Sequence, residues 1–104
     1  MRNFTFIDDA VLAIDAIYKK SNKSFDIYNI ANPKSVKLNY YIKLIDKYLN
    51  KKSIQNKLPL QKGDEKRVNA NISKLRKILK IKKFTDVNKG IKEFIDWYRK
   101  YYNE

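Results

Sequence analysis

The residues best suited to bind a ligand lie in one segment, LPLQKGDEKR, which runs from Leu58 to Arg67. It holds one of the two prolines and one of the two glycines of the chain, so it predicts a turn between regular elements. An amide (Gln61), a carboxylate (Asp64) and a guanidinium (Arg67) lie close together in it. Polar groups on such loops often contact ligands, although a solvated surface turn has the same composition. The segment therefore predicts either a ligand-binding loop or a solvated surface turn.

The composition excludes several kinds of chemistry. The chain of 104 residues contains neither cysteine nor histidine, which removes disulfides, thiolate nucleophiles, zinc-finger spacings and imidazole acid–base chemistry. The adjacent acids Asp8-Asp9 and Asp64-Glu65 are not spaced like a calcium loop, so we expect no metal site. The two glycines lie far apart and cannot form the cluster that a dinucleotide-binding loop needs.

The formal net charge of +13 favours an anionic partner such as nucleic acid, because lysines that neutralise phosphates release counterions. However, only four of the 24 basic residues are arginines, the type preferred for bidentate phosphate contacts. The basic excess is also spread over both halves of the chain, as it would be on solvated helix faces. No apolar run suits a signal peptide or a membrane span, so we expect a cytoplasmic protein without membrane contact.

Apolar periodicity predicts four helices that would position the loop. They run from Asp8 or Asp9 to about Lys20, from about Leu38 to Asn50, over a short segment capped by Asn71, and onward from a cap at Thr85. Their expected buried stripes are Ile7, Val11, Ile14 and Tyr18; Leu38, Ile42, Ile45 and Leu49; Ile72, Leu75 and Leu79; and Val87, Ile91, Phe94 and Tyr98, broadened by Trp97 and Tyr101.

Three short segments have the residue types or alternation of strands: Phe4–Ile7, Phe25–Ala31 and, more weakly, Ser53–Leu60. Together with the helices they predict an α/β protein, more narrowly an α+β fragment. Three strands alone cannot form a well-covered sheet, so the pattern is incomplete. We expect one domain over residues 1–104, because a chain of this length has room for one modest core.

Several motifs, in the same order, resemble one known family. The sequence RNFTFIDD at residues 2–9 resembles the RDFTYIDD segment of extended short-chain dehydrogenase/reductases that epimerise nucleotide sugars, above all the UDP-glucuronate 4-epimerases. IYNIAN at residues 27–32 and LPLQKGD at residues 58–64 are similar to the strand and loop that follow in that family. Residues 71–75 and 90–98 resemble its two closing helices. The resemblance covers nearly the whole chain.

This resemblance implies a truncated enzyme: the C-terminal, substrate-binding lobe of an NAD-dependent epimerase without its Rossmann domain. NAD and the catalytic tyrosine–lysine pair would belong to the missing part, so the chain alone would be inactive and would bind no cofactor. A UDP-sugar is the implied ligand. Arg2 would meet its diphosphate, Asp64 its ribose, and Gln61 and Arg67 would line the nucleotide end. These residue types fit, since guanidinium forks suit phosphates and carboxylates accept from ribose hydroxyls.

The sequence departs from the family pattern at several positions near the implied site. Asn3 replaces an aspartate, Phe6 a tyrosine, Lys62 a proline and Val68 a threonine, so some hydrogen-bonding groups are lost. Either the sugar specificity has changed or the chain is no longer selected for catalysis.

Two other functions remain open. The charge and the aromatic-basic run at residues 97–102 suit a small nucleic-acid-binding module, although Trp97 fits a buried helix stripe better, so we do not expect nucleic acid as the partner. The other possible function is that of a non-catalytic remnant that only interacts with other proteins. Its strands would expose edges once covered by a missing Rossmann domain, and such surfaces favour self-association.

Overall fold

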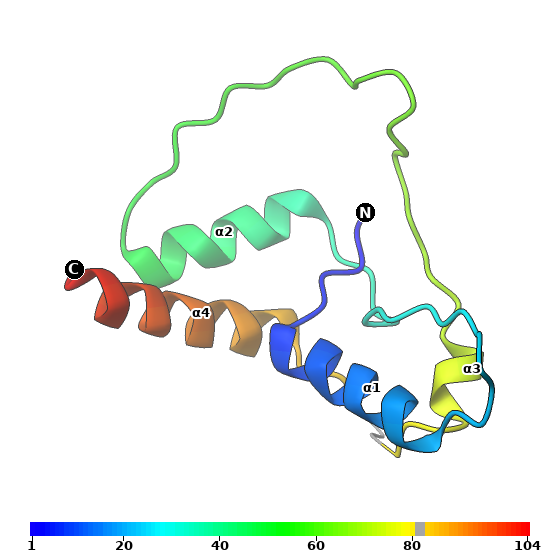
Figure 1. The fold of residues 1–104 in the computed structure, drawn as a ribbon. Coiled ribbons are helices and arrows are strands. Elements are labelled where there is room, and N and C mark those ends of the chain that lie inside the picture. Colours follow the sequence, from blue (N-terminus) through cyan, green and yellow to red (C-terminus); the bar gives the residue numbers. More distant parts are fainter. Residues whose placement is uncertain (81–82) are drawn as a thin grey trace.

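The computed structural model describes residues 1–80 and 83–104 and shows four helices within them (Figure 1). These are α1 (Ile7–Lys20), α2 (Leu38–Leu49), α3 (Ser73–Arg76) and α4 (Val87–Tyr102). Their positions follow the apolar periodicity. The N-cap of α3 is Ile72 and not the expected Asn71, but the Asn71 side chain still accepts from the Ser73 N–H at the start of the helix. Among the helices described, none is both long and apolar enough to cross a bilayer.

The expected α/β fold with three strands is wrong. Within the described residues, Phe25–Ala31 and Ser53–Leu60 form no strand, and the segment that starts at Phe4 passes directly into α1. The β pairing described is one antiparallel bridge between Arg2 and Val36. A strand needs a neighbour for its N–H and C=O groups, and no described segment supplies one. The fold is helical, with long extended connections.

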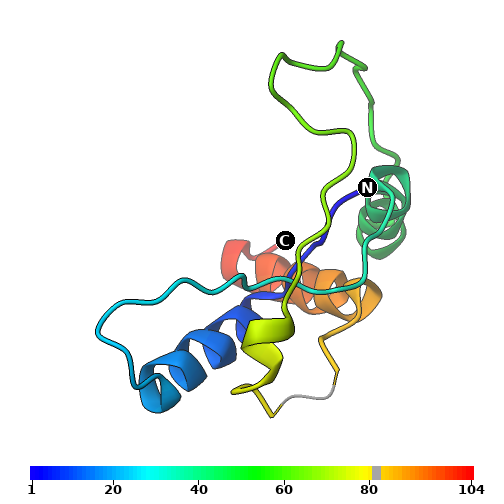
Figure 2. The same ribbon diagram turned by 90° about the vertical axis from the view of Figure 1, so that its right-hand side faces the viewer.

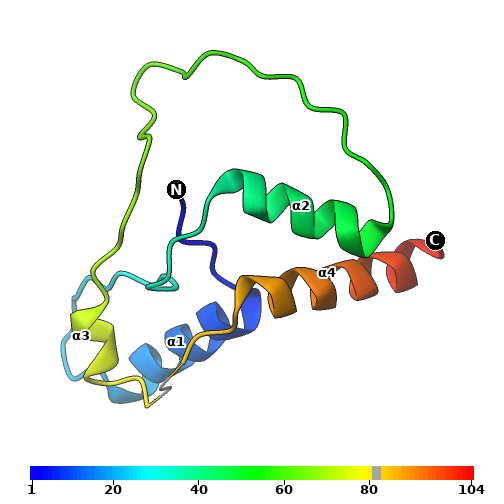
Figure 3. The same cartoon turned by 180° about the vertical axis from the view of Figure 1, so that it is seen from behind.

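The buried apolar side chains form two clusters. The first joins α1 to α3 and consists of Ala13, Ala31, Ile72, Leu75, Leu79 and Phe84. The second joins α2 to α4, which lie side by side, and is built on Leu44, Ile91 and Ile95 (Figures 1 and 3). In this second interface the Tyr48 hydroxyl donates to Asn88 Oδ1. The expected burial of Ile72, Leu75 and Leu79 is thus confirmed, whereas Leu38 on α2 is exposed.

The segment before α1 connects the two clusters. Phe4 stacks on Tyr41 of α2, with ring centroids 4.0 Å apart. Phe6 lies on α4 at Gly90, where an added Cβ would come within 3.2 Å of the phenyl ring. The buried Asn32 adds polar links: its N–H donates to Thr5 Oγ1 at 3.0 Å and its Nδ2 to the Thr85 carbonyl at 3.1 Å.

Asp9 joins α1 to the start of α4 and does not cap its own helix. Its buried carboxylate accepts from the Thr85 backbone N–H at 2.7 Å and from the Thr85 hydroxyl at 2.9 Å. The expected caps at both helices are therefore wrong. The N-cap of α1 is Phe6, without a side-chain hydrogen bond, and the N-cap of α4 is Asp86, whose carboxylate accepts from the Asn88 N–H.

We expect Asp9→Ala to lower the free energy of unfolding by about 2–4 kcal/mol, because both buried donors of Thr85 lose their acceptor. Urea-induced unfolding followed by circular dichroism measures this change. Asp8→Ala is the matched control, since Asp8 lies exposed in the same helical turn and should cost at most about 0.5 kcal/mol. Equal losses in the two variants would contradict the structural role of Asp9.

The stripe of α1 that was expected to be buried faces solvent. Ile7, Val11, Ile14 and Tyr18 are 65%, 54%, 58% and 87% exposed. Ala13 is fully buried instead, and Ala16 and Ile17 pack beside it. We call Ile7, Val11, Ile14 and Tyr18 the outer stripe. On α4, likewise, Phe94, Trp97 and Tyr101 were expected to be buried and are more than half exposed.

The chain exposes more surface than a compact protein of its size. Its accessible surface is 8901 Å², against about 6,200 Å² expected for a folded monomer of the same mass. Its radius of gyration is 16.4 Å, where about 13 Å is typical of a compact domain of this length. Figure 2 shows the cause: a long connection projects away from the helices. Large apolar side chains on this connection, and others on α1 and α4, stay outside the two clusters and are exposed.

Candidate functional site

The connection between α2 and α3 carries the turn that the sequence singled out. Residues 51–69 are exposed and form an extended arch (Figures 1 and 2). Near its far end the chain turns at Gly63, whose φ of +86° favours glycine, and the Asp64 N–H donates to the Gln61 carbonyl at 3.1 Å. The turn therefore fixes the backbone between the predicted amide and carboxylate.

The N-terminal residues hold the end of this arch. Arg2 Nη2 lies 3.3 Å from Asp64 Oδ1, and the two side chains are 35% and 54% exposed. The amino group of Met1 donates to the Lys66 carbonyl at 3.0 Å, and the Val68 N–H donates to the Met1 carbonyl at 3.2 Å. Arg2 is itself fixed by its backbone bridge to Val36, with N···O distances of 3.0 and 2.9 Å. Two distant segments thus bring a guanidinium and a carboxylate together.

An open cavity of about 770 Å³ lies beside this pair. Its lining includes Arg2, Phe4, Leu38, Leu60, Lys66 and Val68. Small-molecule sites commonly have volumes of this order, with apolar walls and a few polar groups. Asn3 also lines the cavity, and its buried Oδ1 has no hydrogen-bond partner among the atoms described.

The four residues singled out in the sequence are only partly brought together. Arg2 lines the cavity and Asp64 pairs with Arg2, whereas Gln61 and Arg67 are exposed and do not line it. The Arg67 guanidinium makes no hydrogen bond or ion pair with any described residue. Sequence reasoning placed Asn3 near the implied site but missed Glu65 and Lys66 in the lining. Their positions between Asp64 and Arg67 were a signal, since neighbours of a ligand-binding residue often share its site.

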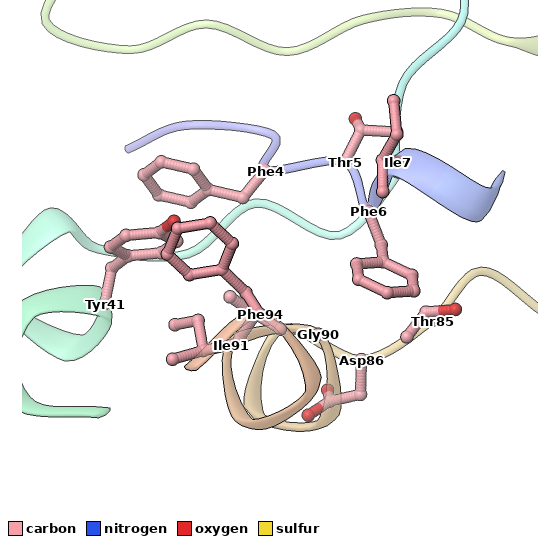
Figure 4. Close-up of a pocket in the computed structure, with 11 residues that line it drawn as sticks. Phe4, Thr5, Phe6, Ile7, Tyr41, Thr85, Asp86, Gly90, Ile91 and Phe94 are labelled. Carbon is pink, nitrogen blue, oxygen red and sulfur yellow. The ribbon is translucent and has the colours of Figure 1, made fainter. Parts of the chain in front are cut away.

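A smaller cavity of about 200 Å³ lies between the start of α1 and α4 (Figure 4). Aromatic side chains of Phe4, Phe6, Tyr41 and Phe94 surround it. It carries no basic side chain, and its volume is below the usual range for small-molecule sites. We therefore interpret it as a packing gap where the two apolar clusters meet.

Two pKa shifts arise from ion pairs away from the cavity. A hydrogen bond from Lys74 lowers the pKa of the Asp26 carboxyl below its ordinary value. A hydrogen bond to Asp96 raises the pKa of the Lys92 ammonium. At the cavity itself the charged side chains of the lining are Arg2, Lys66 and Glu65, and Arg2 is also paired with Asp64.

Comparison with known proteins supports the expected resemblance over the whole chain. No protein-family model matches the chain. Protein CapI of Staphylococcus aureus is 31% identical, over 100% of this chain and 36% of its own length. UDP-glucuronate 4-epimerase 1 of Arabidopsis thaliana is 31% identical, over 97% of this chain and 27% of its own. An uncharacterized protein of Methanocaldococcus jannaschii is 44% identical, over 93% of this chain and 29% of its own.

The chain therefore spans roughly a third or less of the length of these relatives. Within that part it is similar to sugar-nucleotide epimerases. More particularly, five UDP-glucuronate 4-epimerases of Arabidopsis thaliana match it at 28–32% identity.

Proposed function

We propose that this chain forms the nucleotide-binding wall of a UDP-sugar site, as part of a UDP-glucuronate 4-epimerase-like assembly. The observation that carries the proposal is the Arg2–Asp64 pair beside the open cavity, on segments that are similar to UDP-glucuronate 4-epimerases. A guanidinium and a carboxylate side by side suit the two polar parts of a nucleoside diphosphate. The guanidinium binds phosphate oxygens and the carboxylate accepts from ribose hydroxyls.

Arg2 has donors left for a ligand. Its Nη1 donates to the Met1 carbonyl at 3.2 Å and its Nη2 to Asp64 at 3.3 Å. A guanidinium carries five N–H donors, so these contacts orient the group without using all of them. We assign the diphosphate to Arg2 with support from Lys66, the ribose to Asp64, and the mouth of the site to Gln61 and Arg67.

The residues of this chain do not fit NAD. Gly63 lies in the turn of the arch, and Gly90 lies inside α4 under the Phe6 ring. Neither belongs to a glycine-rich turn at a helix start, which pyrophosphate binding by a dinucleotide fold requires. In our proposal this chain binds and orients the sugar nucleotide, and an NAD-binding domain is the partner that carries the catalytic groups.

Titration with UDP-glucuronate, followed by NMR of the whole chain, tests the proposal. We expect dissociation constants of about 1 mM, because one wall of a site supplies only part of its contacts. Signals of Arg2, Asn3, Asp64 and Lys66 should shift, UDP should reproduce these shifts, and glucuronate alone should not. Flat signals in both nucleotide titrations at about 10 mM would exclude the proposed site.

Nucleic-acid binding is a weaker candidate for this structure. The exposed Trp97 and Tyr101 rings, with centroids 5.3 Å apart, could stack on bases. However, Lys89 and Lys92 on the same helix pair with the carboxylates of Glu93 and Asp96. These two lysines are then less available for phosphates, so we assign α4 no nucleic-acid role.

A further inference from the structure

Asn32 is a buried polar residue in the connection between α1 and α2, and only 5% of its surface is exposed. Its backbone N–H donates to Thr5 Oγ1 at 3.0 Å, and its carbonyl accepts from Asn3 Nδ2 at 2.7 Å. Its side-chain Nδ2 donates to the Thr85 carbonyl at 3.1 Å, and its Oδ1 accepts from the Lys34 N–H at 3.0 Å. Burial of an asparagine is costly unless such partners replace water. Asn32 therefore joins three separate parts of the chain.

Asn32 also sets the course of the segment that pairs with Arg2. Its Oδ1 accepts from the residue after Pro33, which closes an Asx-turn, and the ring of Pro33 restricts the backbone there. After this turn, Val36 exchanges two backbone hydrogen bonds with Arg2, at 3.0 and 2.9 Å. The backbone of Arg2 is thus held by Val36, and the residues that follow Arg2 are held by Asn32.

We propose that Asn32, together with the Thr5 hydroxyl, is a positioning residue that holds the Arg2 guanidinium in place for phosphate. This inference rests on the proposed function, in which Arg2 binds the diphosphate. The guanidinium itself contacts only exposed partners among the described residues, namely the Met1 carbonyl and the carboxylate of Asp64 on the arch. The backbone must therefore supply the fixed position, because a binding group needs rigid support to act well.

The Thr5 hydroxyl completes the network around Asn32. It accepts from the Asn32 N–H and donates to the Asn3 carbonyl at 3.2 Å, while the Asn3 side chain donates to the Asn32 carbonyl. Linked hydrogen bonds of this kind make a structure more rigid than separate bonds do. The link from Asn32 to Thr85 ties the network to the start of α4. Because Asn3 directly follows Arg2 and lines the same cavity, a shift of this network would also move the phosphate-binding group.

NMR titration of the Asn32→Ala chain with UDP tests the inference. We expect UDP binding to weaken by about 10-fold, although Asn32 is not among the described residues that line the cavity. Leu75→Ala is the matched control, because Leu75 is fully buried in the first cluster and makes no contact in this network. Its UDP affinity, measured while the chain is still folded, should stay within about twofold of the wild type. Equal losses of affinity in the two variants would mean that Asn32 has only a structural role, and would overturn the proposal.

Two substitutions of Thr5 separate its hydroxyl from the volume of its side chain. Thr5→Val keeps the size but removes the acceptor for the Asn32 N–H, and it should weaken UDP binding by about 3- to 10-fold. Thr5→Ser keeps the hydroxyl and should bind UDP within about twofold of the wild type. A Thr5→Val chain that binds UDP as well as the wild type does would refute the proposal, because Arg2 would then not depend on the network.

Hydrogen exchange at Val36 needs no ligand, so it separates this inference from the proposed function. The Val36 N–H donates to the Arg2 carbonyl at 2.9 Å, and in Asn32→Ala it should exchange at least about 10-fold faster than in the wild type. Binding of UDP by the wild type together with unchanged exchange at Val36 would overturn the inference alone. A wild type whose signals do not shift with UDP would overturn the proposed function on which the inference rests.

Discussion

Leu75→Ala should lower the free energy of unfolding by about 3–4 kcal/mol, which is a large part of the stability of a small domain. Leu75 is fully buried at the centre of the α1–α3 cluster, so alanine would leave a cavity among Ala13, Ile72 and Leu79. The α3 helix has only four residues and depends on this packing for its stability. Urea-induced unfolding measures the change.

Leu58→Ala is the control for this variant, because Leu58 is the same residue type and is 79% exposed on the arch. It should change the free energy of unfolding by at most about 0.5 kcal/mol. Hydrogen exchange gives a second readout. Since the two clusters are separate, the backbone amides of α1 and α3 in Leu75→Ala should lose their protection from exchange first, and those of α2 and α4 later. Uniform loss of protection would show that the chain has one cooperative core.

Arg2→Ala should weaken UDP binding by about 10- to 100-fold, the effect of removing one or two charge-assisted hydrogen bonds to phosphate. The same substitution leaves Asp64 without its ion-pair partner, so the turn of the arch also loses a tether. NMR titration with UDP measures the affinity: from a wild-type dissociation constant of about 1 mM, the Arg2→Ala signals should shift only slightly at the UDP concentrations that saturate the wild type. This prediction depends on the proposed function.

Two variants separate a phosphate contact from a general loss of positive charge. Arg76→Ala removes an exposed guanidinium on α3, outside the residues that line the cavity, and should leave UDP affinity within about twofold of wild type. Arg2→Lys keeps the charge without the fork and should give an intermediate affinity. Equal effects of Arg2→Ala and Arg76→Ala would mean that only net charge attracts the nucleotide.

The helices were predictable from the sequence because their signals are local. Apolar spacing places α2 and α4 close to their observed spans, and Asn71 marks the start of α3. The strands were not predictable in the same way. The alternating apolar and polar residues of Phe25–Ala31 suit a β-strand. A strand forms only when a second segment, distant in the sequence, lies beside it and pairs with it. The described chain has no such neighbour, so these residues stay extended and unpaired.

The prediction of which face of α1 is buried was wrong for a related reason. Large apolar side chains define the outer stripe, and their spacing dominates the periodic signal. The observed core face is built on Ala13, with Ala16 beside it, and small residues let a neighbouring segment approach closely. An alanine at every third position, Ala10, Ala13 and Ala16, was the available signal. Periodicity alone could not show which face of the helix this chain covers.

The site was predictable only through the resemblance to a family. Composition pointed to the turn with Gln61, Asp64 and Arg67, but nothing local connects it to Arg2, which lies 62 residues before Asp64. The contact depends on how the arch returns to the N-terminus. For the same reason the Asp9–Thr85 contact, across 76 residues, could not be read from either helix alone.

The arch that joins α2 to α3 has a consequence for how the two halves of the chain hold together. Helices α1 and α2 precede it and α3 and α4 follow it, yet the apolar clusters pair α1 with α3 and α2 with α4. Each cluster is thus made from both sides of the arch. Its exposed backbone carries several lysines, where a trypsin-like protease could cleave. After such a cleavage, each fragment would still contribute one helix to each cluster. The two fragments should therefore stay associated through both clusters.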